Sequence, residues 1–103
     1  MDPAVKIRNN IFFYTYIIRS YKSDDIYIGY TNDLKKRVNE HNLGLNSSTK
    51  RYMPWQLIYY EACLDKNDAI RREGYLKTSQ GGRLIKRRLK EYLFKNKLNQ
   101  NKI

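Results

Sequence analysis

The sequence contains few residues that form disulfides, bind metal ions or interrupt helices and strands: one cysteine, one histidine and two prolines in 103 residues. The lone thiol, Cys63, cannot form a disulfide within the chain, and we expect it to be a small, buried apolar side chain. No zinc module is evident. No apolar run approaches the roughly 18 residues of a membrane-spanning helix, and residues 1–10 contain no hydrophobic signal core. We therefore expect a cytoplasmic protein with no membrane partner.

Acidic residues are also scarce, because 10 Asp and Glu face 21 Lys and Arg, which gives a net charge of +11. A charge of this size predicts a polyanionic partner, and nucleic acid is the leading candidate. With 41% hydrophobic residues the chain can bury a modest core. No repeat or long linker divides it. We expect one domain over residues 1–103, with its core at about 11–94 and a flexible basic tail at 95–103.

Two segments rich in aromatic and β-branched residues, 12–19 and 26–30, are separated by the polar sequence YKSDD and predict a β-hairpin. Leu34, Val38 and His41 then recur at helical spacing, with Thr31 or Asn32 as the N-cap and Gly44 as the stop. The polar loop 45–54 leads into a third predicted strand, 55–63.

A second helix is predicted to begin at Asp65 and to continue through AIRREGYLK until Gly81 and Gly82 break it. The last helix, 83–94, has an apolar face and a basic face. The predicted fold class is therefore α+β, with a small three-stranded antiparallel sheet, made of the hairpin plus the third strand, flanked by three helices.

Three polar residues lie where an amphipathic helix would place apolar ones. Arg37 and His41 share one edge of the first apolar stripe, and Glu73 lies between apolar residues of the second helix. Each has a simpler explanation. Arg37 is also typical of a solvated cation, His41 of a satisfied edge histidine or a helix C-terminal cation, and Glu73 of an ion pair with Lys77.

Taken together, these residues suggest phosphodiester hydrolysis. If Tyr16 and Tyr27 stand on adjacent strands, the first helix can bring Arg37 and His41 over the two phenols, and the second can bring Glu73. A carboxylate can then hold a divalent cation, an arginine can neutralise phosphate charge, and a phenol or imidazole can help deprotonate water. A phenol is a weak base at neutral pH unless nearby cations lower its pKa, and Arg37 with a metal acts in that direction.

The order of these residues resembles the GIY-YIG nuclease family in its small stand-alone bacterial form. The resemblance covers roughly residues 11–90 and depends on Tyr16 in YTY, the intact YIG at 27–29, TNDLKKRVNEH and RREGYLK. The first triplet departs from the usual G-I-Y, with Tyr14 in place of the glycine. Many relatives also have an asparagine downstream of the glutamate, where this chain offers only Ser79 or Gln80.

The resemblance implies a metal-dependent endonuclease acting on DNA with Mg²⁺ or Mn²⁺ and no small-molecule cofactor. By position, Tyr16 matches the general base and Tyr27 the second phenol. Arg37 matches the phosphate-stabilising arginine, His41 an accompanying histidine, and Glu73 the metal ligand. Gly29 would allow a helix or substrate to approach its strand closely.

Eight basic residues are expected to form a phosphate-binding rim with little sequence preference: Lys35, Lys36, Lys50, Arg51, Arg83, Lys86, Arg87 and Lys90. Two alternatives remain open at this stage. The first is a catalytically inactive nucleic-acid-binding module of the same fold, and the second is a basic adaptor protein whose tyrosines are structural.

Overall fold

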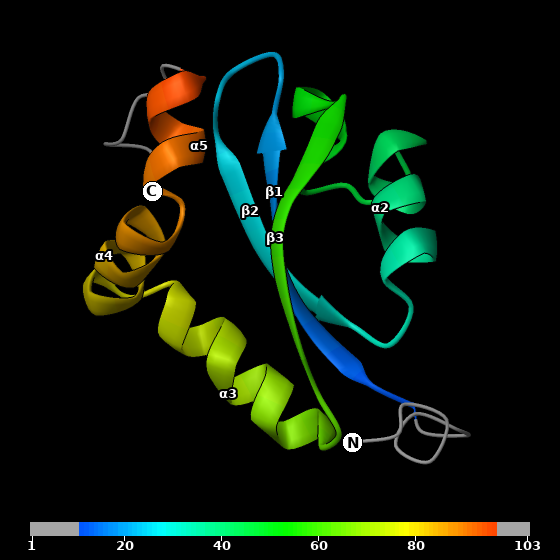
Figure 1. Cartoon of the computed structure of the whole chain (residues 1–103). Helices are drawn as coiled ribbons and strands as arrows, with labels where there is room; N and C mark the ends of the chain where they lie inside the picture. The colour runs from blue at the N-terminus through cyan, green and yellow to red at the C-terminus, as the bar shows by residue number, and fades with distance from the viewer. Residues whose placement is uncertain (1–10, 97–103) are drawn as a thin grey trace, which may run out of the picture.

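The computed structural model describes residues 11–96, which form an antiparallel sheet with helices on both faces (Figure 1). The strands are β1 (Phe13–Ser20), β2 (Ile26–Thr31) and β3 (Trp55–Cys63), in the order β2-β1-β3. The helices are α2 (Leu34–Asn42), α3 (Lys66–Leu76), α4 (Ser79–Arg88) and α5 (Lys90–Lys95), with a 3₁₀ helix, η1, at Lys50–Tyr52. The predicted α+β class and three-stranded sheet are confirmed. None of the helices in residues 11–96 is long and apolar enough to span a membrane.

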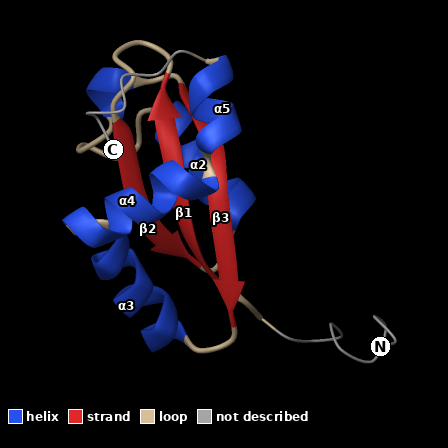
Figure 2. Ribbon diagram, turned by 60° about the vertical axis from the view of Figure 1, so that its left-hand side comes forward, coloured by secondary structure: helices blue, strands red, loops and turns tan. Residues whose placement is uncertain are grey.

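The predicted hairpin places Tyr16 opposite Gly29 and Ile18 opposite Tyr27. Asp24 in its turn has a φ of 63°, a left-handed conformation that aspartate tolerates better than most residues. Because β1 also pairs with β3, the strand that carries Tyr16 lies in the middle of the sheet, as Figure 2 shows. The strand that carries Tyr27 is an edge strand.

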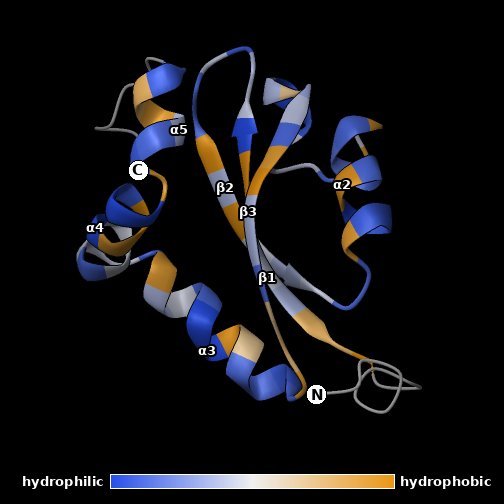
Figure 3. Cartoon of the chain, in the orientation of Figure 1, coloured by the Kyte–Doolittle hydropathy of each residue, from blue (hydrophilic) through white to orange (hydrophobic). Residues whose placement is uncertain are grey.

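Side-chain alternation along β1 supplies two cores, one on each face of the sheet. Tyr16 and Ile18 pack with Trp55 on the face that α2 covers, whereas Ile17 packs with Leu76 and other apolar residues on the face covered by α3 and α4 (Figure 1). Figure 3 shows apolar residues along the strands and hydrophilic residues over much of α2, α3 and α4. The helices are thus held by narrow apolar stripes.

The first helix begins slightly later than predicted. Its N-cap is Asp33, whose carboxylate accepts a hydrogen bond from the backbone N–H of Lys36 at 3.1 Å. Thr31 instead ends β2, and its hydroxyl accepts from the N–H of Asp33. The predicted cap at Thr31 or Asn32 is therefore wrong, because the strand extends farther than its apolar residues do.

The predicted break at Gly81 and Gly82 is also wrong. α3 ends at Leu76, and both glycines lie inside α4, whose N-cap Thr78 accepts from the N–H of Gly81 at 3.1 Å. A Cβ atom on Gly81 would collide with the carbonyl oxygen of Tyr75 and with Cα of Leu76. This glycine therefore permits close packing of the two helices rather than ending one.

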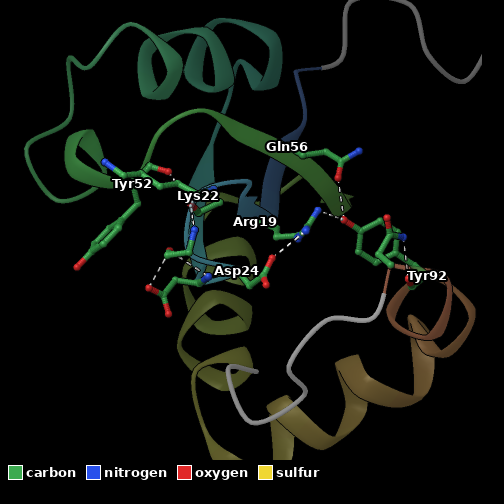
Figure 4. A network of polar contacts seen from close by, with 10 residues as sticks. Arg19, Lys22, Asp24, Tyr52, Gln56 and Tyr92 are labelled. Carbon is green, nitrogen blue, oxygen red and sulfur yellow. Dashed lines mark hydrogen bonds and ion pairs between the residues drawn. The ribbon is translucent and has the colours of Figure 1, made fainter.

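The last predicted helix, 83–94, is divided at Leu89 into α4 and α5. A polar network ties α5 to the sheet (Figure 4). Arg19 donates to Asp24 at 2.8 Å and to the Tyr92 hydroxyl at 3.3 Å, and that hydroxyl donates to Gln56 at 2.7 Å. Of the predicted tail, residues 97–103 lie outside the described part of the chain.

Candidate active site

Tyr16 projects from the middle strand with no exposed surface. Its ring passes directly over Gly29 of the neighbouring strand, so closely that a Cβ atom there would lie 2.6 Å from the Tyr16 hydroxyl oxygen. Gly29 was predicted to admit a helix or substrate, but the group it admits is this tyrosine. The glycine of the YIG triplet therefore fixes where the phenol of the preceding strand can lie.

His41 comes from the last turn of α2 and is also fully buried. Its Nε2 atom lies 2.8 Å from the Tyr16 hydroxyl, and its Nδ1 atom lies 2.7 Å from Oγ1 of Thr49. The Tyr27 ring packs edge-on against the imidazole at 5.1 Å between centroids. Two strands and a helix thus bring both phenols and the imidazole into one cluster.

Burial sets the protonation of this cluster. It raises the pKa of Tyr16 to about 12, Arg37 opposes this increase, and the charge of Glu73 adds to it. Arg37 thus acts in the expected direction, but burial has the larger effect. Burial and the charge of Arg37 lower the pKa of His41. At neutral pH the phenol is protonated and the imidazole is neutral, which does not suit the alternative of His41 as a helix C-terminal cation.

Arg37 lies at the solvent boundary of the cluster, with its side chain 39% exposed. Its Nε donates to Glu40 at 3.1 Å and its NH1 to the Tyr30 carbonyl at 3.4 Å. The guanidinium lines a hollow of about 300 Å³ beside Tyr30, Asn32 and other residues at the end of β2. It is therefore accessible to an anion. Breaking its exposed ion pair with Glu40 would cost little free energy.

Glu73 belongs to α3, which packs on the other face of the sheet. Its charge acts on Tyr16, and its Oε1 atom lies 3.3 Å from Nζ of Lys77, so the ion pair that the sequence left open is present. Residues 11–96 contain no group of three or more His, Cys, Asp or Glu side chains able to hold a metal. One carboxylate fits Mg²⁺, which retains several waters and commonly binds through one or two carboxylates plus substrate phosphate.

A groove of about 470 Å³ runs between the edge strand and the α3–α4 corner. Tyr27 lines it from β2, and Lys77, Thr78 and Ser79 line it from the helices. Ser79 is one of two residues available where relatives have an asparagine, and it faces this groove. The edge strand therefore has an opening at Tyr27 and another at Arg37, with Tyr16 and His41 buried behind it.

The eight predicted basic residues fall into two groups on opposite faces of the sheet (Figure 1). Lys35 and Lys36 belong to α2 and Lys50 and Arg51 to η1, while the other four belong to α4 and α5: Arg83, Lys86, Arg87 and Lys90. None of the eight takes part in an ion pair within residues 11–96. A polyanion that touched both groups would have to cross an edge of the sheet.

No motif or periodicity in the sequence pointed to Thr49. This residue lies in the polar loop before η1, yet it is 1% exposed and holds Nδ1 of His41. No periodic pattern covers the loop, so only its folded path reveals the contact.

Comparisons with known proteins identify the family of this chain. The GIY-YIG catalytic domain family matches residues 12–84. The chain is 43% identical to the UPF0213 protein YazA of Bacillus subtilis over 67% of this chain and 68% of that protein. It is 38% identical to a UPF0213 protein of Clostridium perfringens over 62% and 69% of the two chains, and 34% identical to one of Haloquadratum walsbyi over 67% and 78%. No solved structure matches.

Proposed function

Because the chain belongs to the GIY-YIG catalytic domain family, a family of nucleases, we propose that it is a divalent-metal-dependent endonuclease that hydrolyses DNA phosphodiester bonds. The observation that carries this proposal is the cluster of two phenols and an imidazole, on which an arginine and a glutamate act electrostatically. Tyr16, Tyr27 and His41 are in mutual contact, and Arg37 and Glu73 both act on Tyr16. Such a set can neutralise the charge of a phosphate, hold a cation that polarises it, and deprotonate the attacking water.

The three partly exposed members would meet the substrate. Arg37 would leave Glu40 and neutralise the charge that develops on the phosphate, and Tyr27, which lines the groove, would orient the phosphate or the attacking water. Glu73 would leave Lys77 and hold the cation. Both ion pairs are between residues three or four apart on one helix and contribute only about 0.3–0.5 kcal/mol, so exchanging them for substrate costs little.

When bound, Mg²⁺ or Mn²⁺ would supply charge stabilisation at the phosphate oxygens. The chain's own residues would handle the proton. Tyr16 has no exposed surface in the free protein, so substrate binding would have to admit a water molecule to its hydroxyl. Tyr16 would then take a proton from that water while passing its own proton to Nε2 of His41, which lies 2.8 Å away and would be unprotonated. The two transfers together avoid a free phenolate, which the raised pKa of Tyr16 disfavours at neutral pH.

Binding would depend on the two basic groups and would carry little sequence preference. The charge of +11 attracts the phosphate backbone of any DNA, whereas specificity requires contacts with base edges. We therefore expect the chain to bind DNA of different sequences with similar affinity.

The test is a cleavage assay on single-stranded, duplex, flapped and branched DNA with Mg²⁺, Mn²⁺ or a chelator. We expect the wild type to cut only with metal, and Glu73→Gln and Arg37→Ala to bind DNA but to cut at least about 100-fold more slowly. Matched controls are Glu91→Gln and Arg71→Ala, which change the same side-chain types at exposed positions outside the cluster. Equal cutting by all variants would indicate a contaminating nuclease.

A second candidate is a DNA-binding module without turnover, favoured by one observation: Glu73 is paired with Lys77 and belongs to no group of three or more potential metal ligands within residues 11–96. It predicts salt-sensitive binding with no cleavage under any metal. The third possibility, an adaptor with structural tyrosines, predicts that Tyr16→Phe and Glu73→Gln leave function unchanged.

A further inference from the structure

Thr49 is a buried hydroxyl in direct contact with the candidate proton acceptor. Its side chain is 1% exposed, and Oγ1 lies 2.7 Å from Nδ1 of His41, on the side of the ring opposite Tyr16. A hydroxyl buried to this degree loses its hydrogen bonds to water, and this loss costs free energy unless a protein group replaces them. His41 is that group, so the contact accounts for the burial.

The loop holds this hydroxyl in place through its backbone. The Thr49 carbonyl accepts a hydrogen bond from the indole Nε1 of Trp55 at 3.0 Å, and its N–H donates to the Asn46 carbonyl at 3.2 Å. Asn42 of α2 in turn bonds both backbone groups of Trp55, at 2.6 and 3.0 Å. Thr49 is thereby fixed relative to the helix that carries His41.

The hydrogen-bond donors and acceptors select one tautomer. The Tyr16 hydroxyl is fully buried, so its proton needs an acceptor, and the hydrogen-bond partner of that hydroxyl within residues 11–96 is Nε2 of His41 at 2.8 Å. A neutral imidazole that accepts at Nε2 carries its proton on Nδ1. Thr49 Oγ1 can accept a hydrogen bond from that N–H, because the hydroxyl of Thr49 can donate its own hydrogen to the Asn46 carbonyl at 3.5 Å.

We propose that Thr49 is a positioning residue that holds His41 as the Nδ1–H tautomer, so that Nε2 is free to accept the proton of Tyr16. The tautomer assignment stands on the contacts alone, while its catalytic use rests on the proposed function. The contact with one ring nitrogen decides which nitrogen the other partner meets. In the reverse arrangement Thr49 would donate to Nδ1, and His41 would donate to Tyr16 and could not take its proton.

His41 is the only histidine in the sequence, so its ring nitrogens can be read directly by long-range ¹H–¹⁵N correlation NMR of the labelled full chain. At neutral pH we expect a protonated Nδ1 and an unprotonated Nε2. In Thr49→Val the Nδ1–H would face a methyl group, and we expect most of the protein to change to the Nε2–H tautomer. Thr49→Ser should keep the wild-type pattern.

Thr15→Val is the matched control. Thr15 is 2% exposed, next to Tyr16 in the chain, and donates to the Ala69 carbonyl on the other face of the sheet. The same chemical change there should leave the His41 tautomer unchanged. An Nε2–H tautomer in the wild type, or an unchanged tautomer in a folded Thr49→Val, would overturn the proposal.

Cleavage then tests the catalytic use. We expect Thr49→Val to lower turnover by about 10–100-fold, the usual effect of losing the group that orients a functional histidine, with DNA affinity unchanged and activity restored in Thr49→Ser. If the tautomer changes but turnover does not, the positioning role is wrong. If no variant and no wild-type sample cuts DNA, the proposed function fails while the NMR result still decides the tautomer.

Discussion

The position of the Tyr16 hydroxyl depends on the absence of a side chain at Gly29. Replacing Gly29 by alanine would place a methyl group 2.6 Å from the Tyr16 oxygen, and the phenol ring would have to move away from His41. We expect Gly29→Ala to lower the free energy of unfolding by about 1–3 kcal/mol, measured by urea denaturation, and to abolish cleavage.

Gly74→Ala is the control for this change. Gly74 lies in α3, and nothing lies within 4 Å of its would-be Cβ. Alanine there should stabilise the helix by up to about 1 kcal/mol. Equal effects at the two glycines would show that the contact with Tyr16 is not what constrains position 29.

His41 should also make stability depend on pH. Its pKa is lowered in the folded protein, chiefly by burial, whereas the unfolded chain takes up a proton near the ordinary value of 6.5. Below that value the unfolded state binds more protons, so the free energy of unfolding should fall as pH falls from about 6.5 toward the folded pKa, by at most about 1.4 kcal/mol per pH unit.

Urea denaturation between about pH 5.5 and 7.5, around the ordinary histidine pKa, measures this slope. His41→Gln removes the only imidazole and should be less stable but nearly independent of pH over this interval. A slope of the same size in both proteins would assign it to another group.

Much of this residue-level picture could be derived from the sequence. Of the polar residues that interrupted apolar stripes, His41 contacts Tyr16, and the charges of Arg37 and Glu73 act on it, while their catalytic roles stay predictions. Thr49 could not be derived, because its role follows from the path of a loop that has no periodicity. The full burial of Tyr16 and His41 also could not, since the spacing of a residue does not give its depth.

At the scale of elements, the chain packs α3 and α4 closely at a corner where only a glycine fits. Gly81→Ala would drive a methyl group into backbone atoms of Tyr75 and Leu76, which cannot rotate away. We expect a loss near the upper end of about 1–3 kcal/mol, measured by thermal or urea denaturation. Gln80→Ala, an exposed change in the same turn, should stay within about 0.5 kcal/mol of wild type.

The corner also shows why element boundaries were harder to predict than elements. Two adjacent glycines are typical of a helix end, and the sequence contains nothing that distinguishes a stop from a close contact. In the structure α3 ends at Leu76 with Lys77 as its C-cap, and Thr78 caps the start of α4. Strands, by contrast, were predicted well because their aromatic and β-branched content is local information.

For the whole molecule, the separation of basic residues onto two faces makes DNA binding testable by face. If about five phosphates are neutralised on duplex DNA, the logarithm of the affinity should fall with the logarithm of the salt concentration with a slope of about −4.5. Removing two contacts should make that slope shallower by about 1.8.

Lys35→Ala with Lys36→Ala alters the α2 face, and Arg83→Ala with Arg87→Ala alters the α4 face. We expect each pair of substitutions to make the salt slope shallower, because the grooves at the β2 edge lie between the two faces. A change for only one pair, seen in fluorescence anisotropy titrations, would restrict DNA to that face and contradict the predicted rim.

The middle position of β1 has a further consequence for motion. This strand is hydrogen-bonded on both sides, to β2 and to β3, so its amides are exposed to solvent only when the sheet itself comes apart. The same strand carries Tyr16. In deuterium exchange, the backbone amides of β1 should therefore retain their protons longest. Thermal fraying at the periphery of the molecule would leave the position of the Tyr16 phenol unchanged.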